Sequence, residues 1–479
     1  MIDREIEREE LVALLERPGP MLALLYGRRR VGKTFLLNHA WDESHTFYFV
    51  ASDATPELNR RDLLAELARW SGETLSPDDY PTWRTIFRHI LQMKAPGPLV
   101  VILDEYQYLR GGADDVDSQL AAVWEEYKNR GRKREHFVLV LCGSIVQIME
   151  RLDSAGSPLH GRIDWKHQLC PFDYWNAGLM APFRDPMDRV RTYGIFGGTP
   201  RYLASIRTER SVGENVAHAM LAPRGDVRAQ VETVIEQEKG LRSIAEYKSL
   251  LAAIGLGATE RNSIAQETGL KNDNSLRTML ETLQRLGYVE ARRNFGAPSN
   301  EPFRYRISDP ALRFYYSVVT RYRNELETSP ALDVWKQHVE AELPTYLGHV
   351  FEDIVRQAFY RHRARLGLPM IREWGRWEGT DRDRRPVEID VVARLTDGRM
   401  LTGSVKCRNR LCGPDVHRAH VDGLRRLGES GKRWAHEAMA PGAPILYVSA
   451  SGFTDDFRGR AEEDGHEILM WTLADLYGD

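Results

Sequence analysis

The chain has 479 residues, of which 42% are hydrophobic and 28% are charged, and its formal net charge is −3. These values are typical of a folded protein of roughly two to four domains, and they exclude a disordered chain and a nucleic-acid binder that relies on a global positive field. No apolar run approaches the ~18 residues of a membrane helix, and the first ten residues are too charged for a secretory signal. We therefore expect a cytoplasmic protein without membrane contact. The four cysteines form no CxxC pair, which argues against a zinc site or disulfides.

A helix, a strand and a glycine loop follow one another near the N-terminus. Helical spacing predicts a helix over Ile2–Leu15, and Leu22–Tyr26 is an apolar run suited to a buried strand. Residues 27–34 then fit GxxxxGKT, in which the glycines let successive N–H groups point at phosphate oxygens. We predict a phosphate-binding loop rather than an ordinary glycine turn. Its nucleotide-binding residues are Gly27, Arg28, Arg29, Arg30, Val31, Gly32, Lys33 and Thr34.

The last two residues of this loop have predicted chemical roles. Lys33 would neutralise the β and γ phosphates of ATP during catalysis. Thr34 would hold Mg²⁺ through its hydroxyl, at the positive end of the dipole of the following helix. ATP and Mg²⁺ are therefore the predicted cofactors.

Two carboxylates, Asp104 and Glu105, follow a wholly apolar run. The elements expected between the loop and this pair are a strand at 46–51, helices at 56–70 and 82–93, and a strand at 99–103. The pair would lie at the carboxyl end of a buried strand, where open α/β sheets bind ligands. Asp104 would hold Mg²⁺ and Glu105 would activate the attacking water. A helix N-cap is the alternative role for such a pair.

Two further polar residues are candidates for the same site. A helix at 117–129 and an apolar strand at 137–142 lead to Ser144, which would lie beside Asp104 if the two strands are neighbours. Ser144 would then sense the γ phosphate or cap the next helix, and both roles stay open. Arg162 precedes a fifth strand expected at 163–169. It would reach a phosphate in cis or from a neighbouring subunit of a homo-oligomer, or it is a solvated surface arginine.

Together these motifs resemble the prokaryotic AAA-like ATPases called archaeal-type ATPases, which are related to the STAND ATPases. The matching stretches are IDRE (2–5), YGRRRVGKT (26–34), ILDEYQYL (102–109), LCGS (141–144), SPLHGR (157–162) and FGGTPRYL (196–203). The resemblance implies a RecA/AAA-like parallel sheet that binds ATP, with Lys33, Thr34, Asp104 and Glu105 at matched positions. It also implies a nucleotide-sensing role for Arg201 in the last motif.

The pattern changes in residues 241–307. Three short helices are expected at 248–254, 261–268 and 274–286, followed by strands at 288–293 and 303–307, which is a winged helix-turn-helix outline. This segment has ten Lys and Arg residues and seven Asp and Glu residues, a modest local excess of positive charge. DNA contact is the first interpretation, and an interaction or interdomain role is the alternative.

Three stretches further along the chain, at 307–319, 348–359 and 387–409, resemble the DUF234-type half of the same ATPases. In that group the last segment looks like a PD-(D/E)xK nuclease fold, which implies a site made of Glu352, Asp390 and Lys406. Ser404 stands where a carboxylate is expected. Because a hydroxyl is a weak Mg²⁺ ligand, either Glu388 or Glu352 compensates or cleavage is lost, and we favour loss.

The sequence thus predicts an α/β multidomain protein with a P-loop ATPase core (1–175), a helical lid (176–240), a winged helix (241–325) and a nuclease-like domain (326–479). The predicted function is a Mg²⁺-dependent, ATP-hydrolysing switch or motor with DNA as partner. An ATP-dependent DNA nuclease and a protein-binding signalling ATPase without DNA contact are the alternatives.

Overall fold

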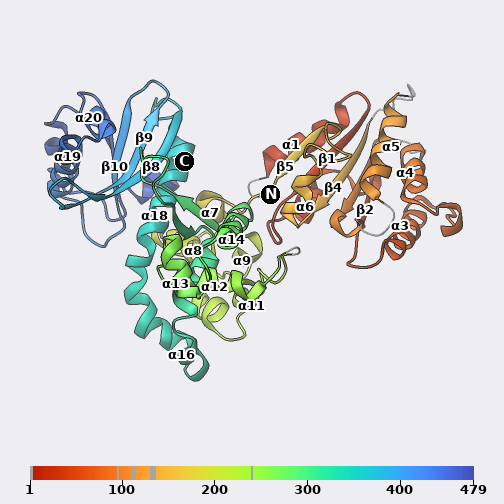
Figure 1. Ribbon diagram of the computed structural model, residues 1–479, viewed down its shortest axis with the longest axis horizontal. Coiled ribbons are helices and arrows are strands. Elements are labelled where there is room, and N and C mark those ends of the chain that lie inside the picture. Colours follow the sequence, from red (N-terminus) through yellow and green to blue (C-terminus); the bar gives the residue numbers. More distant parts are fainter. Residues whose placement is uncertain (1–3, 94–96, 111–114, 130–135, 239–240, 479) are drawn as a thin grey trace. The chain divides into compact units, whose positions relative to one another are not determined.

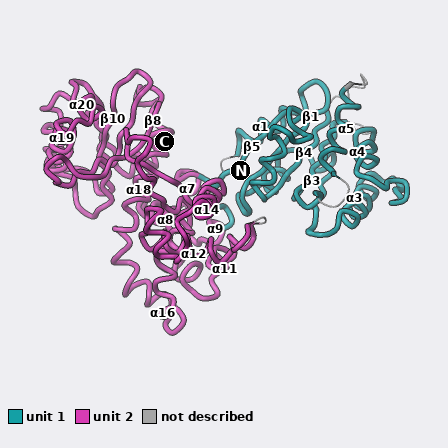
Figure 2. Tube along the Cα trace, viewed as in Figure 1, with its two compact units in different colours: residues 1–172, 199–201 teal, residues 173–198, 202–479 magenta. Residues whose placement is uncertain are grey.

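The computed structural model of the chain describes residues 4–93, 97–110, 115–129, 136–238 and 241–478 (Figure 1). Ile2 and Asp3, at the start of the first predicted helix, lie outside these residues. The chain divides into two compact units (Figure 2): unit 1 is residues 1–172 with 199–201, and unit 2 is the remainder. The finer division into four domains stays a prediction. Among the described residues, no helix combines the length and the apolar character that a bilayer span requires.

Unit 1 contains helices that alternate with the strands of one parallel sheet. Its strands are β1 (Pro20–Tyr26), β2 (Thr46–Val50), β3 (Leu99–Asp104), β4 (Phe137–Gly143) and β5 (Trp165–Gln168). Its helices are α1 (Glu5–Ala13), α2 (Lys33–Ala40), α3 (Pro56–Ser71), α4 (Trp83–Gln92), α5 (Val116–Asn129) and α6 (Val146–Arg151), with short 3₁₀ turns at Leu14–Glu16, Glu43–His45, Pro77–Asp79 and Tyr106–Tyr108. Apart from the start of the first helix, predicted at Ile2 outside the described residues, the elements predicted for this part of the chain are confirmed to within about two residues at their ends.

The helix boundaries have local causes. Thr55 accepts a hydrogen bond from the backbone N–H of Leu58 at the start of α3, Pro56 occupies the first helical position, and Gly72 ends the helix at φ 73°. Thr82 and Thr85 form a reciprocal capping box at the start of α4. These signals are all local in the sequence, so they predict where the helices begin and end.

The strand order of the sheet is β2-β3-β4-β1-β5, and all pairs are parallel. β4 therefore lies between β1 and β3, with Tyr26 paired to Gly143 and Leu103 paired to Leu141. The strand that carries the glycine loop and the strand that carries the carboxylate pair both adjoin β4. Their carboxyl ends meet at one edge of the sheet, which is where ligands bind in sheets of this kind.

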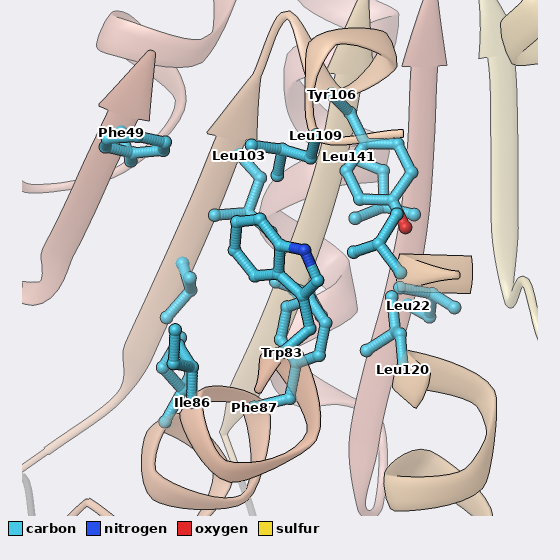
Figure 3. Packing of buried hydrophobic residues seen from close by; sticks show 14 of the residues in the cluster. Leu22, Phe49, Trp83, Ile86, Phe87, Leu103, Tyr106, Leu109, Leu120 and Leu141 are labelled. Carbon is cyan, nitrogen blue, oxygen red and sulfur yellow. The ribbon is translucent and has the colours of Figure 1, made fainter. Parts of the chain in front are cut away.

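Alternate residues of the central strands pack on opposite faces of the sheet. One face includes Leu22, Leu103 and Leu141 and packs against Trp83 and Phe87 of α4 (Figure 3). The other face includes side chains of β1, β3 and β4 and packs against α1 and α2, with Ala23, Leu25, Leu36, Leu37, Val100, Ile102, Val138 and Val140 in the cluster. Because both faces are covered, β1, β3 and β4 are buried along their whole length, as their apolar sequences predict.

Unit 2 is mainly helical over its first half. It contains α7 (Tyr174–Met180), α8 (Pro186–Phe196), α10 (Val212–Val216), α11 (Asp226–Glu232), α12 (Ile244–Gly255), α13 (Arg261–Thr268), α14 (Asn274–Arg285), α15 (Pro310–Phe314), α16 (Arg323–Thr328), α17 (Ala331–Val334) and α18 (Glu340–His362), while α9 (Pro200–Leu203) begins in unit 1 and ends in unit 2. Three π-helical turns occur among them, η5 (Ala217–Leu221), η6 (Tyr315–Val319) and η7 (Trp335–Val339). The antiparallel pair of β6 (Val289–Arg292) and β7 (Arg304–Ile307) follows α14, so the three helices and two strands predicted for residues 241–307 are present.

A second five-stranded sheet occupies the C-terminal part of unit 2. Its order is β12-β11-β10-β9-β8, in which β8, β9 and β10 are antiparallel neighbours and β10, β11 and β12 are parallel. Its strands are β8 (Ile371–Thr380), β9 (Pro386–Leu395), β10 (Met400–Lys406), β11 (Pro444–Ser449) and β12 (Glu467–Trp471), and its helices are α19 (Pro414–Glu429), α20 (Arg433–Ala438), α21 (Phe457–Glu462) and α22 (Leu473–Tyr477). This mixed sheet agrees with the α/β class predicted for the C-terminal part.

Candidate active site

The loop after β1 is held against the neighbouring backbone. The N–H of Gly27 donates to the carbonyl of Gly143 at 3.3 Å. A Cβ on Gly27 would lie 2.2 Å from the carbonyl oxygen of Leu169, so a side chain has no room there. Gly32 has φ 97° and directly precedes α2, and Arg30 has φ 70°. The loop therefore needs glycine at its start for close approach and at its end for backbone conformation.

We expect Gly27→Ala to destabilise unit 1 by about 1–3 kcal/mol, because the added methyl group must displace backbone rather than a flexible side chain. The measurement is thermal unfolding followed by near-UV circular dichroism. Gly348→Ala is the control, since it lies within α18 and a Cβ there meets no atom within 4 Å. If both variants melt like the wild type, the backbone contact at Gly27 is not tight.

Lys33 is the buried cation of the loop. Its side chain folds back over the loop, and Nζ donates to the carbonyls of Gly27 at 2.9 Å and Arg28 at 3.1 Å. The residue is 7% exposed. Its ammonium group therefore lies at the loop backbone. The phosphate oxygens of a bound nucleotide would compete with these two carbonyls for the N–H donors of Lys33.

The other loop residues differ in exposure. The three arginines are half-buried, and Arg29 donates to the hydroxyl of Tyr108 at 3.1 Å. Val31 is buried in the core beside α2. Thus the loop is anchored by one apolar side chain and surrounded by positive charge.

Thr34, Asp104 and Tyr48 meet next to the loop. The hydroxyl of Thr34 donates to Asp104 Oδ2 at 3.3 Å, and the hydroxyl of Tyr48 donates to the same oxygen at 2.5 Å. Burial, and then the charge of Asp104, raise the pKa of Tyr48 far above its usual range, so Tyr48 stays a donor. A hydroxyl beside a carboxylate oxygen is a donor set that suits Mg²⁺.

Glu105 lies in a small hydrogen-bonded group at the ends of β3 and β4. Ser144 Oγ donates to Glu105 Oε2 at 2.7 Å, and Gln107 Nε2 donates to the same oxygen. Glu105 has φ 53°, a left-handed conformation that is uncommon for a side-chain-bearing residue and that turns its carboxylate toward Ser144. A Cβ on Gly143 would lie 2.3 Å from Gln107 Oε1, so this glycine leaves room for the group.

The helix-cap alternatives do not describe these side chains. Ile145 is the N-cap of α6 and makes no side-chain cap, so the hydroxyl of Ser144 is directed to Glu105 instead. Glu105 precedes the 3₁₀ turn at Tyr106–Tyr108 and also makes no side-chain cap. Both polar residues are thus turned toward each other at the carboxyl edge of the sheet.

The two candidate arginines lie in different surroundings. Arg162 pairs with Glu125 at 3.5 Å and donates to the carbonyl of Pro158 at 3.0 Å. It precedes β5, whose first residue, Trp165, pairs with Ala23 and not with the loop end of β1, so within one chain Arg162 is not among the loop residues. Its role in trans stays a prediction.

Arg201 is exposed and follows Pro200, whose ring lies 3.9 Å from the position of a Cβ on Gly32. The segment 199–201 belongs to unit 1 although the residues around it belong to unit 2. Arg201 therefore lies next to the loop, whereas its role in sensing nucleotide is still a prediction.

A second group of carboxylates lies in unit 2. Carboxylate oxygens of Glu352 on α18 and of Glu388 and Asp390 on β9 all lie within 4.8 Å of one another. Lys406 Nζ donates to Asp390 Oδ2 at 3.0 Å, and Ser404 Oγ donates to the same oxygen at 3.2 Å. The fold thus brings together Glu352, Asp390 and Lys406, which the resemblance had grouped.

Arg376 on β8 also belongs to this group. It pairs with Glu352 at 3.2 Å and with Glu388 at 2.7 Å. Burial, and then the charge of Asp390, raise the pKa of Glu388. Glu388 supplies a third carboxylate on the same face as Asp390, because the two are separated by one residue of a strand.

Three of these residues were not found from the sequence. Tyr48 and Arg376 stand in strands with no distinguishing motif, and only the pairing of neighbouring strands brings them to the carboxylates. Gln107 had a weak signal, because it stands three residues after Asp104 in the stretch that resembles the archaeal-type ATPases.

Comparison with known proteins agrees with this arrangement. Residues 1–206 match a family described as an ATPase domain predominantly from Archaea. Residues 315–419 match DUF234, archaeal and bacterial proteins of unknown function. The protein is a P-loop ATPase. More narrowly, the chain joins an archaeal-type ATPase domain of this family to a DUF234 segment.

Individual relatives are distant. An uncharacterized protein of Methanocaldococcus jannaschii is 23% identical over 431 residues, which cover 89% of this chain and 91% of the relative. Among solved structures, a Walker-type ATPase of Pyrococcus abyssi is 22% identical with a TM-score of 0.45, covering 66% of this chain and 96% of its own. The ORC2 protein of Aeropyrum pernix, in ADPNP and ADP complexes, is 15% identical with a TM-score of 0.45, covering 68% of this chain and 95% of its own.

Proposed function

We propose that the protein is a Mg²⁺-dependent ATP-hydrolysing switch that associates with DNA. The observation that carries the hydrolytic part is the meeting of Lys33, Thr34–Asp104 and Glu105 at the carboxyl ends of the three adjacent strands β1, β4 and β3. These groups would have separate roles. The loop with Lys33 would bind the phosphates, and Glu105 would activate the attacking water.

Lys33 would exchange its two loop carbonyls for phosphate oxygens. Its charge would then offset the negative charge that develops during transfer. Thr34 and Asp104 would hold Mg²⁺, which would supply positive charge to offset that of the phosphates. Tyr48 would keep Asp104 oriented through its short hydrogen bond.

Glu105 would orient the attacking water and accept its proton. Ser144 and Gln107 both donate to Glu105 Oε2, and this leaves Oε1 available for that proton. Ser144 connects Glu105 to the end of β4, and Gln107 donates to both, so a movement of the backbone at this edge of the sheet would change the position of the Glu105 carboxylate. Such a connection is what a nucleotide-dependent switch requires.

The support for DNA contact is the outer face of α14. Leu276, Leu280 and Leu283 are buried on its inner side. The residues of the opposite face are all exposed, and they are Ser275, Arg277, Thr278, Glu281 and Arg285. Helices presented in this way can enter the major groove, where arginines contact phosphates and bases.

We expect the double variant Arg277→Glu, Arg285→Glu to bind double-stranded DNA at least tenfold more weakly than the wild type, because two attractive charges become repulsive. The measurement is fluorescence anisotropy at two salt concentrations. The control, Arg323→Glu with Arg418→Glu, makes the same charge change on exposed residues of α16 and α19. If both double variants lost the same affinity for DNA, the net charge of the protein rather than the outer face of α14 would determine binding.

The function as a whole is tested by ATP hydrolysis with and without double-stranded DNA, with the DNA followed on a gel in the same tubes. Stimulation by DNA that leaves the DNA intact supports the switch. If DNA neither binds nor changes turnover, the DNA part fails. If a protein partner alters turnover while DNA does not, the protein-binding signalling ATPase is the better description.

A second candidate function is metal-dependent DNA cleavage in unit 2. The three carboxylates of Glu352, Glu388 and Asp390 favour it, because Glu388 would supply the metal ligand that Ser404 does not. The position of Lys406 on Asp390 also fits, since a lysine there can offset charge in the transition state.

We expect Asp390→Ala to abolish any Mg²⁺- or Mn²⁺-dependent cutting and to leave ATP hydrolysis unchanged. Removal of Asp390 takes away one cation ligand and the partner of Lys406. Asp397→Ala is the control, an acidic residue further along the same hairpin that pairs with Arg399. DNA that remains intact with the wild type under both metals would leave the carboxylate group without a nuclease role.

A further inference from the structure

The carboxylates grouped around Asp390 in unit 2 are already paired with positive charges of the chain itself. The guanidinium group of Arg376 lies between Glu352 of α18 and Glu388 of β9, with Nη1 at 3.2 Å from Glu352 Oε2 and Nη2 at 2.7 Å from Glu388 Oε1. Lys406 Nζ lies 3.0 Å from Asp390 Oδ2. All three carboxylates of the group therefore have a cation of the chain as a partner.

The charge balance of this group sets Arg376 against a metal ion. Carboxylate oxygens of Glu352, Glu388 and Asp390 lie within 4.8 Å of one another, close enough to share one ion. With Arg376 and Lys406 in place, the three carboxylates keep one unbalanced negative charge. Without Arg376 they keep two, which a divalent cation balances. The guanidinium group and a divalent cation therefore compete for the same carboxylates.

Arg376 stands at an irregularity of β8. The register between β8 and β9 shifts between Gly375 and Trp377, so Arg376 is the residue at the shift. Irregularities of this kind re-aim a side chain and are common next to active sites. The carbonyl of Arg376 accepts from the N–H of Phe295, in the loop between β6 and β7, at 2.8 Å. Its backbone is therefore held in place, and rotation of the side chain is what takes the guanidinium group away from the carboxylates.

Glu378 offers the guanidinium group a further partner nearer the solvent. Arg376 Nη2 lies 3.1 Å from Glu378 Oε2. The side chain of Glu378 is 51% exposed, whereas that of Glu352 is 13% exposed. Arg376 can thus leave Glu352 and Glu388 and still keep an ion-pair partner.

We propose that Arg376 is a resident cation of the carboxylate group, which a divalent metal ion must displace in order to bind Glu352, Glu388 and Asp390. The inference rests on the second candidate function, because it concerns the same carboxylates. A cavity of about 290 Å³ has Glu352, Arg376 and Asp390 in its wall, so an ion has room to enter. Displacement turns the guanidinium group toward Glu378. The contact of Arg376 with the carboxylates is therefore autoinhibitory, since it weakens metal binding.

The test measures binding of Mn²⁺ to the full chain without nucleotide, by electron paramagnetic resonance of the free ion. Asp390→Ala is made alone and together with each variant, and the binding that it removes is assigned to the carboxylate group. Arg376→Gln should bind Mn²⁺ at this site about tenfold or more tightly than the wild type, because the competing charge is gone. Arg372→Gln makes the same charge change at an exposed position of β8 and should stay within about twofold of the wild type.

Arg376→Lys provides the test if Arg376→Gln does not fold. Lysine keeps the positive charge but lacks the guanidinium fork that contacts two carboxylates at once, so this variant should bind Mn²⁺ more tightly than the wild type and less tightly than Arg376→Gln. The inference is overturned if neither variant binds Mn²⁺ at this site more tightly than the wild type, or if Arg372→Gln gains as much. Cleavage of DNA is scored separately. Intact DNA with an Arg376→Gln protein that binds Mn²⁺ more tightly would reject the nuclease and leave the role of Arg376 standing.

Discussion

Lys33→Ala is expected to lower the rate of ATP hydrolysis by about 10²–10³-fold, because the transferred phosphoryl group loses a buried, preorganised positive charge. The free energy of unfolding should fall by only about 1 kcal/mol, since what is lost in the folded protein is hydrogen bonds to two loop carbonyls. The measurement is steady-state phosphate release at saturating ATP, with thermal unfolding recorded on the same preparations.

Lys166→Ala is the matched control for this variant. Lys166 is an exposed lysine of β5, next to β1 in the same sheet, and it pairs with Asp153 at 3.4 Å. Its removal should leave hydrolysis within about twofold of the wild type, because an exposed ion pair contributes little. If Lys33→Ala hydrolyses ATP as fast as Lys166→Ala, the loop after β1 is not the catalytic site.

Glu105→Gln is expected to reduce hydrolysis by about 10²–10⁴-fold while ATP still binds. The amide keeps the shape of the side chain but cannot accept a proton from water, and Lys33 and Thr34 remain in place to hold the phosphates. Two measurements separate these effects: the Kd for a fluorescent ATP analogue, and single-turnover hydrolysis.

Ser144→Ala completes this comparison. It removes one of the two donors to Glu105 Oε2 and leaves the other, Gln107, in place. We expect a smaller loss of hydrolysis, about tenfold, because the base remains but is less well oriented. A Glu105→Gln protein that loses ATP binding and hydrolysis together would indicate that Glu105 holds the nucleotide rather than acting on water.

Much of the architecture could be predicted because its signals are local. Apolar runs at 22–26, 99–103 and 137–142 predicted the three central strands, and their complete burial explains why these runs are unbroken. Helical spacing likewise predicted the three helices of residues 241–307, where Leu276, Leu280, Leu283 and Leu286 are buried as expected. Some boundaries were less accurate, since β5 covers only Trp165–Gln168 and α12 begins at Ile244, four residues before the predicted start.

The residues of the candidate sites could likewise be predicted only where they belong to a local sequence pattern. GxxxxGKT and the Asp104–Glu105 pair are compact patterns, so their residues could be chosen from the sequence. Tyr48 and Gln107 could not be assigned, because their contacts with Asp104 and Glu105 follow from the pairing of β2 with β3 and from the space beside Gly143. Arg162 ends the stretch SPLHGR, which resembles the archaeal-type ATPases. In the fold, however, it pairs with Glu125 and lies away from the loop.

By itself, the sequence determined that this is a multidomain α/β protein with a phosphate-binding loop, because hydrophobic period and glycine spacing act over a few residues. Only the tertiary structure decided that β4 lies between β1 and β3, and thus that Ser144 donates to Glu105. It also decided that Glu388 and Arg376 complete the group around Asp390. Such contacts join residues far apart in the chain, and local patterns do not encode their distances.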